Sequence, residues 1–60
     1  MNAHHVKFRV IRRDSPDCTK IGIEVMRERH PGEQLAVVIL EFSNGLRRAF
    51  LENEIERIKK

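Results

Sequence analysis

The chain has few of the residues that disulfide, cofactor and base-stacking chemistry require. Its 60 residues include one cysteine, three phenylalanines, and no tryptophan or tyrosine. A single cysteine excludes a disulfide bond within the chain and is typical of a reducing compartment, so we expect a cytoplasmic protein. The length allows one domain with a core of marginal size, which argues against a large enzyme cleft.

Long apolar runs are also missing. The longest, residues 35–40, is far shorter than the roughly 20 residues that a membrane-spanning helix needs. The first nine residues, MNAHHVKFR, are polar and lack the apolar centre of a signal peptide. We therefore expect neither secretion nor membrane insertion.

Residues that bind metals or act as nucleophiles are few and scattered. The available soft ligands are His4, His5, Cys18 and His30. No spacing among them matches a zinc site. A Cys18 nucleophile would have only His30 as a base away from the N-terminus, in a chain too short to form much of a pocket. The sequence therefore predicts a protein that is not an enzyme and that has no metal and no cofactor.

Four extended segments alternate with turn signals. Apolar and basic residues alternate over residues 6–10, the pattern of a strand with one buried face. Gly22 within the second segment indicates a bulge or a close approach. The four segments are 5–12, 19–27, 35–42 and 46–51. The sequence predicts a single mainly β domain over residues 1–60, a four-stranded antiparallel meander with a flexible start at residues 1–4.

The dipeptide Asn44-Gly45 between the last two segments predicts a two-residue type I′ turn, in which both residues have positive φ. Such a turn fixes the register and would pair Ile39 with Phe50. One face of this hairpin is then expected in the core, with the residues Ala36, Val38, Leu40, Phe42, Ala49 and Leu51. The opposite face has an apolar centre at Val37, Ile39 and Phe50.

The C-terminal segment, residues 51–60, fits two closing structures. Asn53 followed by Glu56 resembles a helix capping arrangement, and the aliphatic residues at 51, 55 and 58 would share one helical face. A single helical turn that ends in a short strand fits equally well, because the segment is too short to be helical by itself. The predicted fold is therefore an SH3-like small barrel, or a sheet capped by a short C-terminal helix.

The apolar centre of the second hairpin face predicts a protein-binding site at Val37, Ile39 and Phe50. The alternative is that these residues form ordinary core beneath the C-terminal segment. Pairing two such sheets would cover surplus apolar surface, which predicts a homodimer.

The basic residues offer a second kind of surface. The chain has 12 lysines and arginines against nine acidic residues, a formal net charge of +3 at pH 7. Such a balance weakly favours acidic partners. The predicted nucleic-acid-binding residues are Lys7, Arg9, Arg12, Arg13, Arg47 and Arg48. The alternative is that they lie on solvated strand faces and edges, where charge deters aggregation. Three phenylalanines also leave little surface for base stacking.

The stretch VVILEFSNGLRRAFLENEIERI, residues 37–58, resembles a Tudor-like, SH3-type small barrel. The similar domains are the RNA-polymerase-interacting domains of the CarD and transcription-repair coupling factor family. The resemblance lies in residues 41–45, where a strand ends in Glu, an aromatic, a small residue and Asn-Gly, followed by Leu51, Ile55 and Ile58 at similar offsets. It implies a noncatalytic adaptor that docks on a protein, a nucleic acid or both, with an exposed sheet edge as one means of docking.

The function predicted from the sequence is a small noncatalytic interaction or regulatory module that docks on a protein partner, with the transcription machinery as one candidate. The first alternative is a nucleic-acid-binding protein that uses a basic strand face. The second is a small inhibitor of a host enzyme, for which the size of the chain is the only argument.

Overall fold

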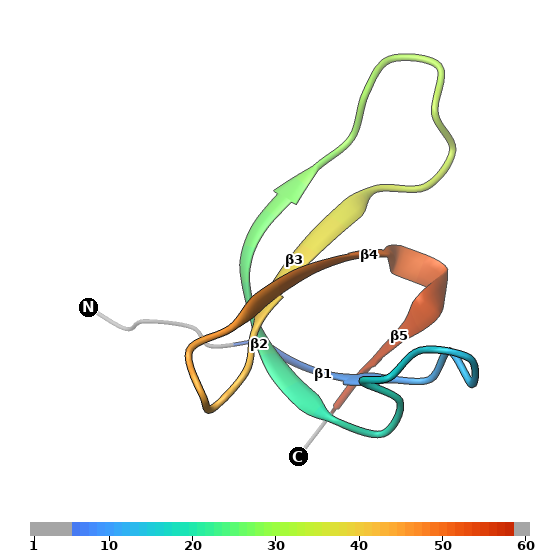
Figure 1. Cartoon of the computed structure of the whole chain (residues 1–60). Coiled ribbons are helices and arrows are strands. Elements are labelled where there is room, and N and C mark those ends of the chain that lie inside the picture. The colour runs from blue at the N-terminus through green and yellow to red at the C-terminus, as the bar shows by residue number, and fades with distance from the viewer. Residues whose placement is uncertain (1–5, 59–60) are drawn as a thin grey trace.

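The computed structural model describes residues 6–58 and contains one antiparallel β-sheet (Figure 1). Its elements are β1 (Lys7–Val10), β2 (Ile21–Glu28), β3 (Val37–Glu41), β4 (Arg47–Leu51), the 3-10 turn η1 (Glu52–Glu54) and β5 (Ile55–Arg57). The strand order is β4-β3-β2-β1-β5. The predicted mainly β, antiparallel architecture is confirmed, with a fifth strand in addition to the predicted four. The predicted flexible start at residues 1–4 lies outside the described residues.

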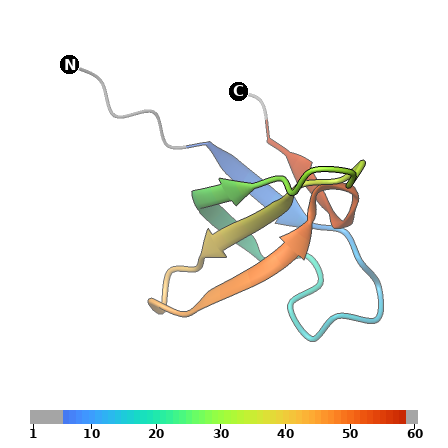
Figure 2. The same ribbon diagram turned by 90° about the horizontal axis from the view of Figure 1, so that it is seen from above.

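The sheet curls about β2. Residues 21–23 of β2 pair with β1, whereas residues 23–28 pair with β3 on both sides of a bulge between Glu24 and Met26. A bulge bends its strand and increases the local twist. The curl therefore brings β1 and β5 across the core from β3 and β4 (Figures 1 and 2).

Gly22 permits the close packing at this bend. It is buried, and a Cβ atom at this position would lie 3.0 Å from the Cβ of Leu40 and 3.1 Å from the ring of Phe42. The close approach predicted for Gly22 is therefore confirmed. A larger residue would require the neighbouring Leu40 or Phe42 side chain to move by a few tenths of an ångström within the core.

Of the two closing structures predicted for the C-terminal segment, the short helix is not supported, and the single helical turn that ends in a short strand is confirmed. Only η1 is helical in the C-terminal segment as far as residue 58, and Ile55 is extended and begins β5, which pairs with β1. The side chain of Glu54 accepts a hydrogen bond from the Leu51 N–H at 2.9 Å and holds the turn. Burial of Ile55 in the core favours the strand over a helix too short to be stable alone.

A closed barrel is not supported either. Over residues 6–58, β4 and β5 are the two edges of an open sheet. The short turn η1 connects these edges covalently, and the buried side chains pack between the two halves of the curled sheet.

The hairpin between β3 and β4 has a register one residue away from the predicted one. Its turn contains three residues, because the Phe42 N–H donates to the Leu46 carbonyl and the Gly45 N–H donates to the Phe42 carbonyl, both at 2.9 Å. Gly45 alone has positive φ in this turn (+88°), so the predicted type I′ turn, which needs a positive φ at Asn44 as well, is wrong. This is the arrangement in which a type I turn is followed by a glycine bulge.

The new register exchanges the faces of β4. Phe50 lies opposite Val38 and is buried, whereas Ala49 and Leu51, which were predicted in the core, are exposed. Burial of the phenylalanine ring favours this register, since an aromatic side chain removes far more apolar surface from water than alanine does.

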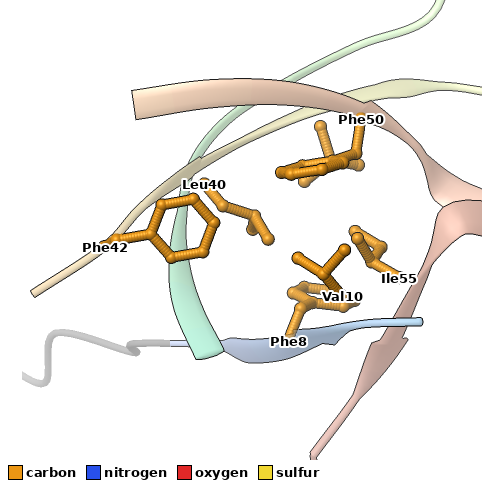
Figure 3. Packing of buried hydrophobic residues seen from close by; sticks show 7 residues of the cluster. Phe8, Val10, Leu40, Phe42, Phe50 and Ile55 are labelled. Carbon is orange, nitrogen blue, oxygen red and sulfur yellow. The ribbon is translucent and has the colours of Figure 1, made fainter. Parts of the chain in front are cut away.

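The core is made by the inner face of the curled sheet. Its cluster contains Phe8, Val10, Val38, Leu40, Phe42, Phe50 and Ile55. Figure 3 shows side chains from β1, β3, β4 and β5 converging on one another. The rings of Phe42 and Phe50 pack edge to face, with centroids 6.3 Å apart. All three phenylalanines of the chain are thus used in the core.

The register predicts unequal effects of truncating neighbouring residues in β4. Phe50→Ala should lower the free energy of unfolding by about 3–5 kcal/mol, or unfold the protein, because it empties the core. Leu51→Ala should lower it by less than about 1 kcal/mol, because Leu51 is 40% exposed. Urea unfolding followed by circular dichroism measures both, with Phe50→Leu as a milder variant that should still fold. A larger loss for Leu51→Ala than for Phe50→Leu would contradict the register.

Candidate functional site

The face of the sheet opposite the core, the outer face, carries an apolar cluster that no element covers within residues 6–58. Strand pairing places aliphatic residues from β2, β3 and β4 next to one another on this face. We call the following residues the outer apolar patch: Ile21, Ile23, Met26, Val37, Ile39, Ala49 and Leu51. Met26 is 56% exposed and Ile21 is 46% exposed.

The bulge in β2 is what brings Ile23 and Met26 to the same face. Side chains of a regular strand alternate, so residues three apart would point to opposite sides. Ile23 is in register with Glu41, and Met26 is in register with Ile39, because Val25 is the extra residue between them. The outer apolar patch therefore extends across β2 without interruption.

The predicted protein-binding residues divide between the two faces. Val37 and Ile39 lie in the outer apolar patch, as expected, but Phe50 lies in the core and is not available to a partner. Met26 and Leu51 take its place on the outer face. The aliphatic character of β2 signalled its contribution to this face, but the bulge could not be positioned from the sequence pattern.

Charged side chains border the outer apolar patch. Lys7 and Arg9 of β1 are in register with Ile23 and Ile21, and are exposed. Arg47 of β4 is in register with Glu41, and their side chains form an ion pair of 2.8 Å. The predicted register, which pairs Ile39 with Phe50, would have placed Arg48 opposite Glu41 instead. An apolar centre with a charged border is the usual composition of a protein-binding surface.

A groove runs along one end of this face, where β2 and β3 separate. A hollow of about 320 Å³ is lined by Ile21, Ile23, Glu41 and their neighbours, with Lys7 at its side. A second hollow of about 240 Å³ adjoins it and is bordered by Lys20. The two hollows share Ile21, Phe42 and Ser43, and we call them together the outer groove.

The six predicted nucleic-acid-binding cations do not form one surface. Lys7 and Arg9 lie on the outer face of β1, and Arg13 lies exposed in the following turn. Arg12 is bound to Asp14 at 2.6 Å and to Glu54 at 3.0 Å, and ties the turn to η1.

The remaining two cations, from β4, point to opposite faces. Arg47 pairs with Glu41 on the outer face, whereas Arg48 lies on the inner side opposite Leu40 and reaches Asp17 at 2.8 Å. Half of the predicted cations, Arg12, Arg47 and Arg48, are therefore engaged by carboxylates of the protein itself.

Electrostatic contacts organise the loop between β1 and β2. The hydrogen bond from Arg12, together with its positive charge, lowers the pKa of Asp14 below its ordinary value. Asp17 is the buried charged residue of the described chain, with 4% of its surface exposed. Its carboxylate accepts Arg48 on one oxygen and lies 3.4 Å from Lys20 on the other. These contacts fix the loop against β4.

In the part of the chain that the structure describes, the remaining candidate metal-binding and nucleophilic residues do not form a cluster. Residues 6–58 contain no group of three or more His, Cys, Asp or Glu side chains placed to hold a metal ion. Cys18 is half-buried and His30 is exposed near the turn that follows β2, while His4 and His5 lie outside the described residues. Between residues 6 and 58, no helix has the length and apolar character needed to cross a membrane.

Comparisons with known proteins add no family to this geometry. No protein-family model, curated protein or solved structure matches the chain. The resemblance of residues 37–58 to the RNA-polymerase-interacting domains therefore stays a prediction, and the function has to be argued from the surface.

The two adjacent arginines of β4 should differ in their effect on stability. Arg48→Ala leaves the buried Asp17 without its closest partner and should lower the free energy of unfolding by about 1–3 kcal/mol. Arg47→Ala removes an exposed ion pair and should cost less than about 1 kcal/mol. Urea unfolding of both variants measures the difference. In an Asp17→Asn background the effect of Arg48→Ala should shrink, and equal losses for the two arginine variants would contradict the assignment.

Proposed function

We propose that this protein is a noncatalytic interaction module that binds a protein partner through the outer apolar patch. The observation that carries the proposal is the continuity of this patch over β2, β3 and β4, with an apolar centre and a charged border. Monomeric proteins rarely leave such contiguous apolar surface uncovered unless it has a binding role.

The strength of the interaction follows from the exposure of the patch. Ile21, Met26 and Leu51 are each 40–56% exposed, so about half of each side chain remains to be buried. Completing their burial would contribute roughly 2–4 kcal/mol in total, before the cost of association is subtracted. A face of this size supports a small, reversible interface rather than an obligate one.

The alternative of nucleic-acid binding receives less support. Three of the six cations are neutralised by carboxylates, and all three phenylalanines are buried and cannot stack on bases. The resemblance of residues 37–58 to polymerase-interacting domains makes the transcription machinery the first partner to test.

The proposal predicts that one charge placed on the patch abolishes partner binding without unfolding the protein. The test variant is Met26→Glu, because Met26 is 56% exposed and in the patch. The matched control is Leu46→Glu, because Leu46 is similarly exposed, at 53%, but follows the hairpin turn and lies outside the patch. Both should keep the circular dichroism spectrum of the unchanged protein.

The measurement is affinity purification of the tagged protein from its own cells after nuclease treatment, followed by calorimetry with the purified partner. The partner should bind the unchanged protein and Leu46→Glu with similar affinity, and Met26→Glu at least about tenfold more weakly, since 1.4 kcal/mol corresponds to a factor of ten. Sedimentation of the protein alone tests the predicted homodimer. Loss of the partner on nuclease treatment, or equal binding by both variants, would contradict the proposal.

A further inference from the structure

The outer groove has features that specify the kind of protein segment it can hold. It lies where the ladder between β2 and β3 stops, and it is hollow because Ser43 and Asn44 turn away toward β4. Its walls are the aliphatic side chains of Ile21 and Ile23. This groove adjoins the rest of the outer apolar patch through these two isoleucines.

One backbone position of β2 faces the outer groove without a strand partner. The Val10 N–H donates to the Lys20 carbonyl, and the Glu24 N–H donates to the Val6 carbonyl, both at 2.9 Å. Even-numbered residues in this half of β2 therefore direct their backbone groups toward β1.

In an antiparallel sheet, backbone groups of successive residues point to alternate sides. Ile21 and Ile23 therefore direct theirs toward β3. Ile23 is in register with Glu41, the last residue of β3, but the position opposite Ile21 is occupied by the turn. In the described chain, the N–H and carbonyl of Ile21 thus open into the outer groove with no ladder partner.

The charge around the outer groove is positive. Lys7 and Lys20 border its two hollows, and Arg9 lies beside Ile21 on β1. Lys20 lies 3.4 Å from Asp17, but that single carboxylate also pairs with Arg48 at 2.8 Å. Among residues 6–58, no carboxylate lies within ion-pair distance of Lys7 or Arg9. Glu41 also lines the groove, but Arg47 neutralises it at 2.8 Å.

We propose that the outer groove binds an extended, acidic segment of the protein partner. One residue of the segment pairs its backbone with the N–H and carbonyl of Ile21, as in the addition of a strand to a sheet. A neighbouring apolar side chain packs on Ile21 and Ile23, and flanking carboxylates reach Lys7 and Lys20. The inference rests on the proposed function and names the chemistry of the partner.

A peptide fits this position better than a phosphate group does. The exposed backbone of Ile21 offers both a donor and an acceptor, and a peptide unit satisfies both. A phosphate group at neutral pH accepts hydrogen bonds but would leave the carbonyl of Ile21 facing negative charge. All three phenylalanine rings are buried, so none of them can stack on a base.

The probe is a short acetylated peptide that alternates glutamate with valine, titrated against ¹⁵N-labelled protein. Amide shifts should be largest at Ile21, Ile23 and Ser43. The same peptide with lysine in place of glutamate should not bind, because it would bring positive charge to a positive groove. Methylation of the central backbone nitrogens of the acidic peptide should weaken binding, because it removes the donors that reach the Ile21 carbonyl.

Charge reversal in the protein separates this site from the rest of the surface. The double variant Lys7→Glu with Lys20→Ala should weaken binding of the acidic peptide at least about tenfold, because one attractive charge is reversed and another is removed. Alanine at position 20 places no new carboxylate beside Asp17. The control variant Arg57→Glu, on the exposed far edge at β5, should change it less than about twofold. Equal binding of the acidic and basic peptides, no binding at millimolar peptide, or shifts confined to another face would overturn the inference.

Two further outcomes distinguish this inference from the proposed function. If Met26→Glu abolishes partner binding while Lys7→Glu with Lys20→Ala leaves it intact, the interaction module stands and the peptide groove is wrong. If a thymidine oligonucleotide produces the same shifts as the acidic peptide with higher affinity, the outer groove is a phosphate site and the inference is overturned. Weakened binding of both peptide and partner by the double variant supports the inference.

Discussion

The three-residue turn between β3 and β4 is the constraint on which the rest of the structure depends. By giving positive φ to Gly45 alone, it places Phe50 opposite Val38, where the ring joins the core, and it turns Ala49 and Leu51 outward. Because side chains alternate along a strand, a shift of one residue would exchange every contact of β4. The length of this turn therefore determines which residues of β4 lie on the outer face.

The uncovered outer face is also a consequence of size. The curl at the bulge of β2 uses five short strands to enclose one core, and no further element is present in residues 6–58 to cover the other side. The basic side chains are likewise divided between structural contacts and surface that a partner can reach. Arg12 and Arg48 hold the turns and loops in place, and Lys20 also lies 3.4 Å from Asp17. The positive charge left for partners is therefore concentrated at Lys7 and Arg9 beside the outer groove.

The sequence predicted the strands well and their register less well. Alternation in residues 6–10 correctly placed Phe8 and Val10 inward, and Gly22 correctly marked a close approach. The type of turn could not be chosen from Asn44-Gly45, because this dipeptide serves both two-residue and three-residue hairpins, and burial of distant residues decides between them. Burial also decides between helix and strand in the C-terminal segment, because Ile55 lies in the core as the first residue of β5.

The register of the hairpin is tested most directly by contacts between backbone Hα protons in a nuclear Overhauser spectrum. Since Phe42 and Leu46 form a hydrogen-bonded pair, Ile39 and Ala49 form a non-hydrogen-bonded pair, with Cα atoms about 4.5 Å apart and Hα protons facing each other. The account predicts a strong Hα contact between Ile39 and Ala49. A strong contact between Leu40 and Ala49 instead would contradict it, because Phe50 would then lie on the outer face.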